Sequence, residues 1–380
     1  ENYGFVVFQR GTVTRRVPYF FLAERPALAV APVHVLTRRV SGDTRTGPNR
    51  VSAYAFPTAP FGNAPDTPPM VEAGGEILYE TELDRPAANI GVSLVQVSRG
   101  AQIDPFFLGA QDESSVQGFA GTPVDVNALT SDYLFRIGAA GASFPRQGRY
   151  YVAVDSSLER FTGASRAGHF VLRSWVNDVT PPSLRPLTLR VSTGRPTLVL
   201  RALDSQSGVD PLSLTIGLKG LLVGASSYDP LTGVAVFALP QSVPALAAGN
   251  LKLRLTASDF EEAKNVNTSG ASIMPNTRTV DVRIRVVSGP AVDWADPAGT
   301  ACLTGNQRLR VAASSSRGVR RVRFLVDGRQ VAVADKGSLG LWSATWRTAG
   351  AAKGRHVLEA VAVDGAGRAA SARRIVRVCR

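Results

Sequence analysis

The strongest constraint on the fold is an alternation of apolar and charged residues near the C-terminal end of the sequence. Residues 319–326 read VRRVRFLV, and apolar side chains fill every second position from Val322 onward. This period of two is that of a β-strand with one buried face. Asp327 and Gly328 follow at once, and an Asp-Gly pair is a strong signal for a tight hairpin turn. Residues 357–363 alternate again and end in a second Asp-Gly pair. The sequence therefore predicts antiparallel strands in this region.

The composition extends that prediction to the whole chain. Apolar residues make up 44% of the 380 residues and charged residues only 19%, with 36 Gly and 24 Pro. This is a folded, turn-rich composition, and the length exceeds what one core usually serves. Short alternating apolar runs bounded by Gly, Pro, Asp and Ser recur throughout, which predicts an all-β protein built of tandem β-sandwiches. No apolar run approaches the roughly 18 residues that would indicate a transmembrane span.

The C-terminal region carries a recognisable sequence pattern. It begins with VRFLVDG at residues 322–328, continues with Trp346 and ends with GRHVLEAVAVDGAG at residues 354–367. Over residues 289–380 the pattern resembles the bacterial immunoglobulin-like module of secreted and cell-surface proteins. Modules of that kind are spacers and binding platforms, so the resemblance implies a region without catalysis.

Two further phrases resemble accessory domains of secreted peptidases. YGFVVFQRGTVTRRVPYFF, at residues 3–21, resembles the end of the fibronectin-like domain that follows the catalytic domain in large secreted subtilisin-like serine peptidases. GRYYVAVDS at residues 148–156, followed by GHFVLRSWVND at residues 168–178, is similar to jelly-roll domains C-terminal to secreted peptidases. Those domains help secretion, maturation or substrate docking. The resemblances imply a catalytic domain upstream in the same chain.

The boundaries between segments follow from Pro and Gly. A stretch rich in both runs to residue 75, and Thr180-Pro181-Pro182 opens an extended entry to a new module, because proline cannot donate to a strand ladder. A strand is expected at residues 133–137. The predicted segments are the C-terminal part of a fibronectin-like domain that starts before residue 1 (1–58), a linker (59–75), a jelly-roll-like accessory sandwich (76–178), an immunoglobulin-like sandwich (179–288) and a bacterial immunoglobulin-like module (289–380).

Cys302 and Cys379 are the two cysteines of the chain, and they bracket the last module. In an oxidising compartment this spacing permits one disulfide between the first and last strands of a sandwich. The alternative is a pair of buried free thiols. A zinc site would need further His or Cys ligands at short spacing, which the sequence lacks.

The positive charge is concentrated in the last module. Of the net charge of +13, about ten units come from residues 289–380, which hold sixteen Arg and Lys against six Asp and Glu. Arg321 and Arg323 share one face of their predicted strand, which makes them a candidate patch for an anionic polymer such as a cell-wall polymer. The alternative is a solvated surface whose Arg content reflects genome composition. Specific nucleic-acid binding is disfavoured, because no nucleic-acid motif is present.

The sequence lacks the constellations that catalysis requires. His34, His169 and His356 each lie in or beside a strand-like run, where structural roles are expected. No Gly-x-Ser-x-Gly elbow, subtilase triad phrase, His-Glu-x-x-His motif or phosphate-binding loop occurs. These residues are therefore predicted to contain no active site and to require no cofactor.

Calcium is the one metal that the sequence suggests. Asp204, Asp210 and Asp259 follow strands of the third module, and the loops of a sandwich cluster at its two ends. The alternative is that these carboxylates only cap local turns.

Together these observations predict the non-catalytic C-terminal accessory region of a secreted, extracellular or cell-surface subtilisin-like serine peptidase. Its role would be to stabilise the parent, to space it from a surface or to dock substrate. The rival hypothesis is a surface-adhesion or anionic-polymer-binding protein with no protease upstream.

Overall fold

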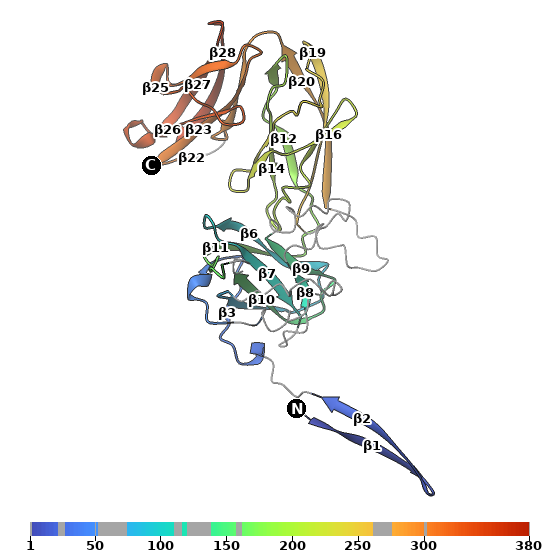
Figure 1. The fold of residues 1–380 in the computed structure, drawn as a ribbon. Helices are drawn as coiled ribbons and strands as arrows, with labels where there is room; N and C mark the ends of the chain where they lie inside the picture. Colours follow the sequence, from blue (N-terminus) through green and yellow to red (C-terminus); the bar gives the residue numbers. More distant parts are fainter. Residues whose placement is uncertain are drawn as a thin grey trace. The chain divides into compact units, whose positions relative to one another are not determined.

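The computed structural model describes residues 2–21, 27–49, 51, 74–109, 116–119, 138–156, 162–260, 276–299 and 302–379. Its described elements are almost all β-strands, which confirms the all-β prediction (Figure 1). The chain forms two compact units, one up to residue 174 and one from residue 175 onward. Most of the predicted linker and the strand expected at residues 133–137 lie outside the described residues.

The first unit begins with a hairpin whose two strands pair only with each other among the described residues. A sandwich follows, made of the sheets β3-β5-β10-β7-β8 and β4-β11-β6-β9. Its elements are β1 Asn2–Arg10, β2 Val13–Phe21, η1 Ala27–Ala29, β3 His34–Val35, β4 Arg39–Asp43, η2 Thr44–Thr46, β5 Ile77–Leu83, β6 Asn89–Val97, β7 Ile103–Leu108, β8 Val116–Phe119, β9 Ala139–Ser143, β10 Gly148–Ser156 and β11 His169–Val176.

The sandwich takes in residues that the sequence division assigned to the preceding segment. β3 pairs in parallel with β5, and β4 pairs with β11, while Leu28 and Val51 are buried beside Leu78. The expected segment 1–58 is therefore divided in the structure, with the hairpin on one side and residues 27–51 in the sandwich. Short strands such as β3 give too weak an alternation to reveal this pairing.

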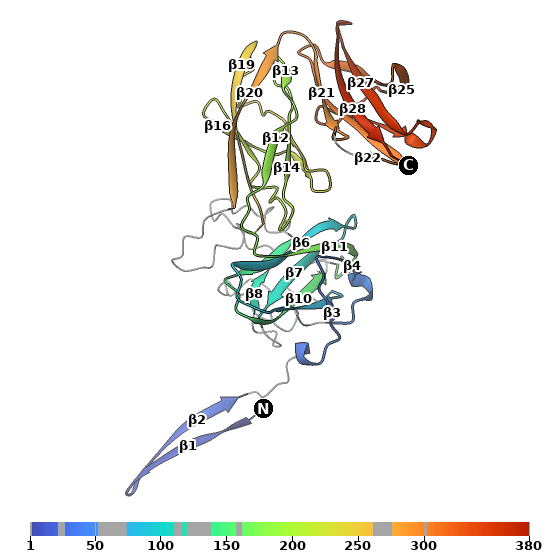
Figure 2. The ribbon, with the colours of Figure 1, turned by 180° about the vertical axis from the view of Figure 1, so that it is seen from behind.

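The second unit holds two further sandwiches (Figure 2). The third module pairs the sheets β12-β14-β18-β17 and β13-β20-β19-β15-β16, and the last module pairs β21-β23-β26 and β22-β28-β27-β24-β25. Their elements are β12 Ser183–Pro186, β13 Arg190–Ser192, β14 Leu198–Leu203, β15 Thr215–Leu218, β16 Leu221–Gly224, β17 Ser227–Asp229, β18 Val234–Phe237, β19 Gly249–Ser258, β20 Thr277–Val287, β21 Ala291–Asp296, β22 Cys302–Leu303, β23 Asn306–Ser314, β24 Val319–Val326, β25 Arg329–Ala334, β26 Leu341–Arg347, η5 Thr348–Gly350, β27 Gly354–Asp364 and β28 Ala369–Val378.

The alternating residues 319–326 form strand β24. Val322 and Phe324 are fully buried in the core of the last module, whereas Arg321 and Arg323 are exposed. Asp327 and Gly328 connect β24 to β25 with φ values of 49° and 79°. Two successive positive φ values define the type I′ turn that joins twisted antiparallel strands. The predicted hairpin is therefore confirmed.

Candidate functional site

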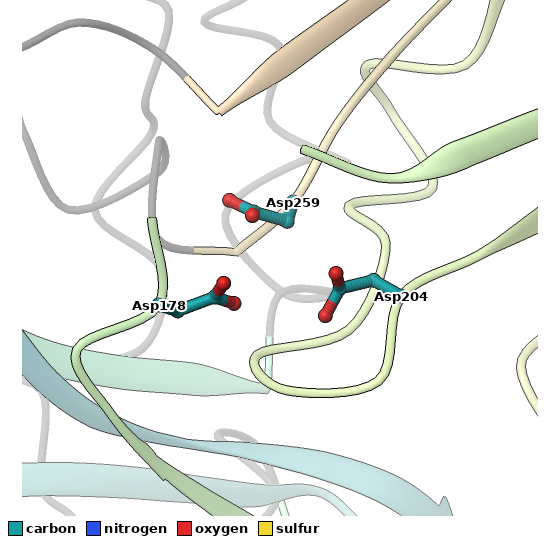
Figure 3. A group of neighbouring side chains, drawn as sticks. All are labelled: Asp178, Asp204 and Asp259. Atoms are coloured by element: carbon teal, nitrogen blue, oxygen red, sulfur yellow. The ribbon is translucent and has the colours of Figure 1, made fainter. Parts of the chain in front are cut away.

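Three aspartates converge at one pole of the third module. Asp178 follows β11, Asp204 follows β14 and Asp259 follows β19, so three separate connections bring them together (Figure 3). Asp178 and Asp259 are fully buried. Each of the three offers a carboxylate oxygen, and these oxygens all lie within 4.8 Å of one another. Oxygen ligands bind calcium at roughly 2.3–2.6 Å, so one ion could reach all three.

Backbone amides fix two of these carboxylates. Oδ2 of Asp178 accepts a hydrogen bond from the Ser207 N–H at 2.8 Å, and Oδ1 of Asp204 accepts from the Gln206 and Gly208 N–H groups, each at 2.8 Å. The turn after β14 is thus ordered around the acidic group. The cluster offers the hard oxygen donors that calcium takes.

The membership of this cluster differs from the sequence expectation. Asp204 and Asp259 were predicted as calcium ligands, and the structure places them together. Asp210 is not part of the group, because its Oδ1 accepts a hydrogen bond from the Leu212 N–H at 3.0 Å and so orders a turn of its own. Asp178 was missed. Its position two residues before Thr180, where the Thr-Pro-Pro entry begins, marked it as a boundary residue, and a ligand role depends on the fold of the next module.

Arg321 and Arg323 lie on the outward face of the larger sheet of the last module. Their cross-strand neighbours in β27 are Val363 and Val361. Arg321 has one distant ion-pair partner, Asp335, at 3.9 Å. Exposed arginines of β27 and β28 extend the positive charge over the same face: Arg355, Arg373 and Arg377. The acidic residues Glu359 and Asp335 interrupt it.

The histidines lie in or beside strands, as expected. His356 is buried, and its Nδ1 lies 2.6 Å from Oδ2 of Asp327 while its Nε2 lies 2.7 Å from the Ala352 carbonyl oxygen. The Ala352 carbonyl and the Asp327 carboxylate raise the pKa of His356. The ring therefore ties the β24–β25 turn to the start of β27. His34 and His169 are exposed on β3 and β11.

Cys302 and Cys379 form a disulfide, with their Cα atoms 5.6 Å apart. The short strand β22 pairs in parallel with the end of β28, which sets the two cysteines side by side. The predicted link between the first and last parts of the module is therefore present. It encloses most of the last module in one covalent loop.

A buried ionic network joins the third and last modules. The guanidinium of Arg201, on β14, contacts Asp296 at the end of β21 and donates to the Ala295 carbonyl oxygen at 2.8 Å. Arg310, on β23, donates to the same Asp296 at 2.8 Å and returns to the third module through the hydroxyl of Thr232 at 2.7 Å. Sequence reasoning gave no signal for this network, because its members lie up to 109 positions apart.

An apolar contact and further hydrogen bonds surround the network. Residues of both modules form one buried cluster: Leu187, Val199, Val234, Val236, Ala295 and Ala312. The carboxylate of Asp293 also accepts hydrogen bonds from the Leu189 and Arg190 N–H groups at 2.8 and 2.9 Å. Charged groups of low exposure are costly to separate once paired. The third and last modules therefore share both polar and apolar buried contacts.

Among the described residues, no helix has the length and apolar character to cross a bilayer. A family model described as "Bacterial Ig domain" matches residues 290–360. No curated protein matches the sequence.

Solved structures of low similarity include fibronectin(III)-like modules of CbhA from Clostridium thermocellum, at 18% identity and a TM-score of 0.21, covering 52% of this chain and 93% of that one. Latent PorU from Porphyromonas gingivalis matches at 14% identity and a TM-score of 0.32, over 80% of this chain and 31% of that one. SGBP-B from Bacteroides ovatus matches at 14% identity and a TM-score of 0.24, over 59% and 57%. Scores of this size carry no argument about function. The sequence match shows a bacterial immunoglobulin domain in the last module.

Proposed function

We propose that this chain is a non-catalytic accessory region of an extracellular protein, in which the third and last modules act as one rigid spacer. The observation that carries the proposal is the buried junction of Arg201, Asp296 and Arg310 with its apolar surround. A flexible tether would need no such contact, since domains joined by small polar interfaces move relative to one another. A fixed junction keeps the start of the third module at a constant distance from the outward face of the last module.

Calorimetry tests the rigid spacer directly. The third and last modules of the full chain should unfold in one coupled transition, and Asp296→Ala should separate it into two, because the substitution leaves two buried guanidinium groups without their shared carboxylate. Asp281→Ala is the matched control, since it removes a carboxylate that forms only exposed ion pairs with Lys252 and Arg254. Independent transitions of the two modules in the unmodified chain would contradict the spacer role.

The parent is proposed to be a subtilisin-like serine peptidase. Support comes from the phrases at residues 3–21, 148–156 and 168–178, which resemble its accessory domains. The hairpin provides further support, because its exposed apolar side chains would be buried if a second sheet packed on them. Among the described residues no such sheet pairs with the hairpin. The upstream reading frame tests the proposal: Asp, His and Ser blocks of a subtilase support it, and further sandwich repeats contradict it. Incubated with casein, the chain alone should release no peptide above the blank.

The hairpin also indicates which of its edges would receive that sheet. Gly11 and Thr12 form its two-residue loop, so Arg10 and Val13 are a hydrogen-bonded pair. Moving away from the loop, non-hydrogen-bonded and hydrogen-bonded pairs then alternate along the two strands. Pro18 therefore falls in a non-hydrogen-bonded pair opposite Phe5, and its missing N–H belongs to the outer edge of β2. β1 contains no proline, so its outer edge lacks no N–H donor. A further strand would therefore pair with β1.

A second candidate function is binding of an anionic polymer by the last module. The outward face that holds Arg321, Arg323 and the arginines of β27 and β28 favours it. Binding should weaken steeply as salt rises, because it releases counterions. Replacing Arg321 and Arg323 with Ser should weaken binding and leave the melting temperature unchanged, since both side chains are exposed. Binding that does not respond to salt would contradict this function.

A further inference from the structure

The last strand of the chain places an arginine at a core-facing position. Alternate residues of β28 face the core, where Ala372 and Val376 pack, and Arg374 lies between them opposite the buried Leu358. Charged side chains rarely occupy such positions unless they have a partner. Two nitrogens of Arg374 donate to the carbonyl oxygens of Pro297 and Trp294, at 2.7 and 2.9 Å. Among the described residues, no carboxylate oxygen lies within 4.0 Å of its guanidinium.

Arg374 borders a cavity at the junction of the two modules. The cavity has a volume of about 410 Å³ and is lined by residues of β12, β21 and β28. Its lining includes Arg185 and the side chains of Leu187 and Leu189 from the third module, and Asp293, Arg373 and Arg374 from the last. A cavity of this size with apolar walls and a few converging polar groups is typical of small-molecule sites.

The charges around the cavity leave an excess of about one positive unit. Arg373 is paired with Glu359 on the outer face, and the carboxylate of Asp293 can offset one further cation. Arg185 is exposed and forms no ion pair among the described residues, so it and Arg374 together exceed Asp293 by one charge. Burial, and then the nearby cations Arg201 and Arg185, lower the pKa of Arg374 to about 10. A bound anion would offset the repulsion between Arg374 and these cations.

We propose that this cavity binds a small organic monoanion, whose carboxylate pairs with Arg185 and Arg374 and whose body lies against Leu187 and Leu189. The planar guanidinium matches a carboxylate with two parallel hydrogen bonds. A single negative charge balances the excess, whereas a dianion such as sulfate would exceed it. The two arginines come from different modules, so the site rests on the proposed rigid junction, which would keep them at a constant separation.

Isothermal titration of the full chain tests this site with hexanoate and glucuronate as probes. At least one of the two should bind saturably with a stoichiometry of one, and the two arms distinguish an apolar body from a sugar body. Neutral hexanol and glucose should not bind, and inorganic sulfate should bind more weakly than the better carboxylate. No saturable carboxylate binding, or sulfate binding of equal strength, would overturn the proposal.

Arg185→Gln is the decisive variant, because the exposed side chain of Arg185 can be replaced without disturbing a buried contact. It should weaken the carboxylate about tenfold or more, as expected for the loss of a charge-assisted hydrogen bond. Arg320→Gln removes the same charge from an exposed position of β24 outside the cavity, and should leave the affinity unchanged. Equal effects of the two variants would show a general charge effect and overturn the site.

Discussion

The hairpin and the last module both contain strands rich in apolar residues. These residues are exposed in the hairpin and buried in the last module. Residues of both hairpin faces are apolar and exposed: Tyr3, Phe5 and Phe20 on one, and Val6, Phe8 and Tyr19 on the other. In the last module, alternating residues of β24 and β27 are buried against the facing sheet and its tryptophans. Strands form in both regions, but a core forms only where a second sheet faces the first.

The largest expected contrast is between two phenylalanines. Phe324→Ala should lower the free energy of unfolding of the last module by about 3–5 kcal/mol, because it opens a cavity in a fully closed core. Phe5→Ala is the matched substitution in the hairpin and should change stability by less than about 0.5 kcal/mol, since its ring is exposed. Urea unfolding followed by tryptophan fluorescence measures the first, and thermal unfolding of the whole chain measures the second.

A longer chain would sharpen that contrast. If upstream residues cover the hairpin, Phe5→Ala should become costly in the longer protein. An unchanged effect there would contradict the proposed completion of the hairpin sheet.

The next prediction concerns the stability that the Cys302–Cys379 disulfide gives to the last module. Its cysteines are 77 residues apart in sequence, so by the chain-entropy model the crosslink contributes about 4 kcal/mol through restriction of the unfolded chain. Cys302→Ser with Cys379→Ser should therefore lower the melting temperature of the last module and leave the first unit unaffected. Non-reducing mass analysis of the unmodified chain should find no free thiol. Two free thiols after denaturation would refute the crosslink.

The third module has no cysteine, and a calcium ion is predicted to link the loops at one of its ends. If Asp178, Asp204 and Asp259 bind the ion, calcium at about 100 times its Kd should stabilise this module by about 2.7 kcal/mol. EDTA should reverse the effect, and Asp204→Asn should abolish it. Asp210→Asn is the control, because Asp210 is not a member of the cluster. If calcium does not change the melting temperature, the three aspartates only cap local turns.

The smallest expected effect is the pH dependence of the last module. The pKa of His356 is raised in the folded state, so its protonated form stabilises the fold. That contribution is fully present below the unfolded value of about 6.5 and is lost as the pH rises through the higher folded value. His356→Gln should remove this part of the pH profile. Thermal unfolding between pH 5 and pH 9 measures it, and an equal slope in both proteins would contradict the assignment.

The sequence predicted the features that depend on local chemistry. Alternation gave β24 and β27, and Asp327-Gly328 gave the turn, because each depends on residues a few positions apart. The cysteine pairing could also be anticipated, since only one pair is available. Of the three predicted calcium ligands, Asp204 and Asp259 converge with Asp178, whereas Asp210 caps its own turn. Calcium binding itself stays a prediction.

By itself, then, the sequence determined that this chain is a series of β-sandwiches, because the period of apolar residues decides which face of a strand is buried. Tertiary structure alone decided which strands share a sheet, as β3 and β4 show by joining the sandwich of β5 and β11. It also decided that Arg201, Asp296 and Arg310 meet, and that Arg185 and Arg374 border one cavity. These contacts join residues far apart in the chain, and their energies depend on burial and on distances that local sequence does not encode.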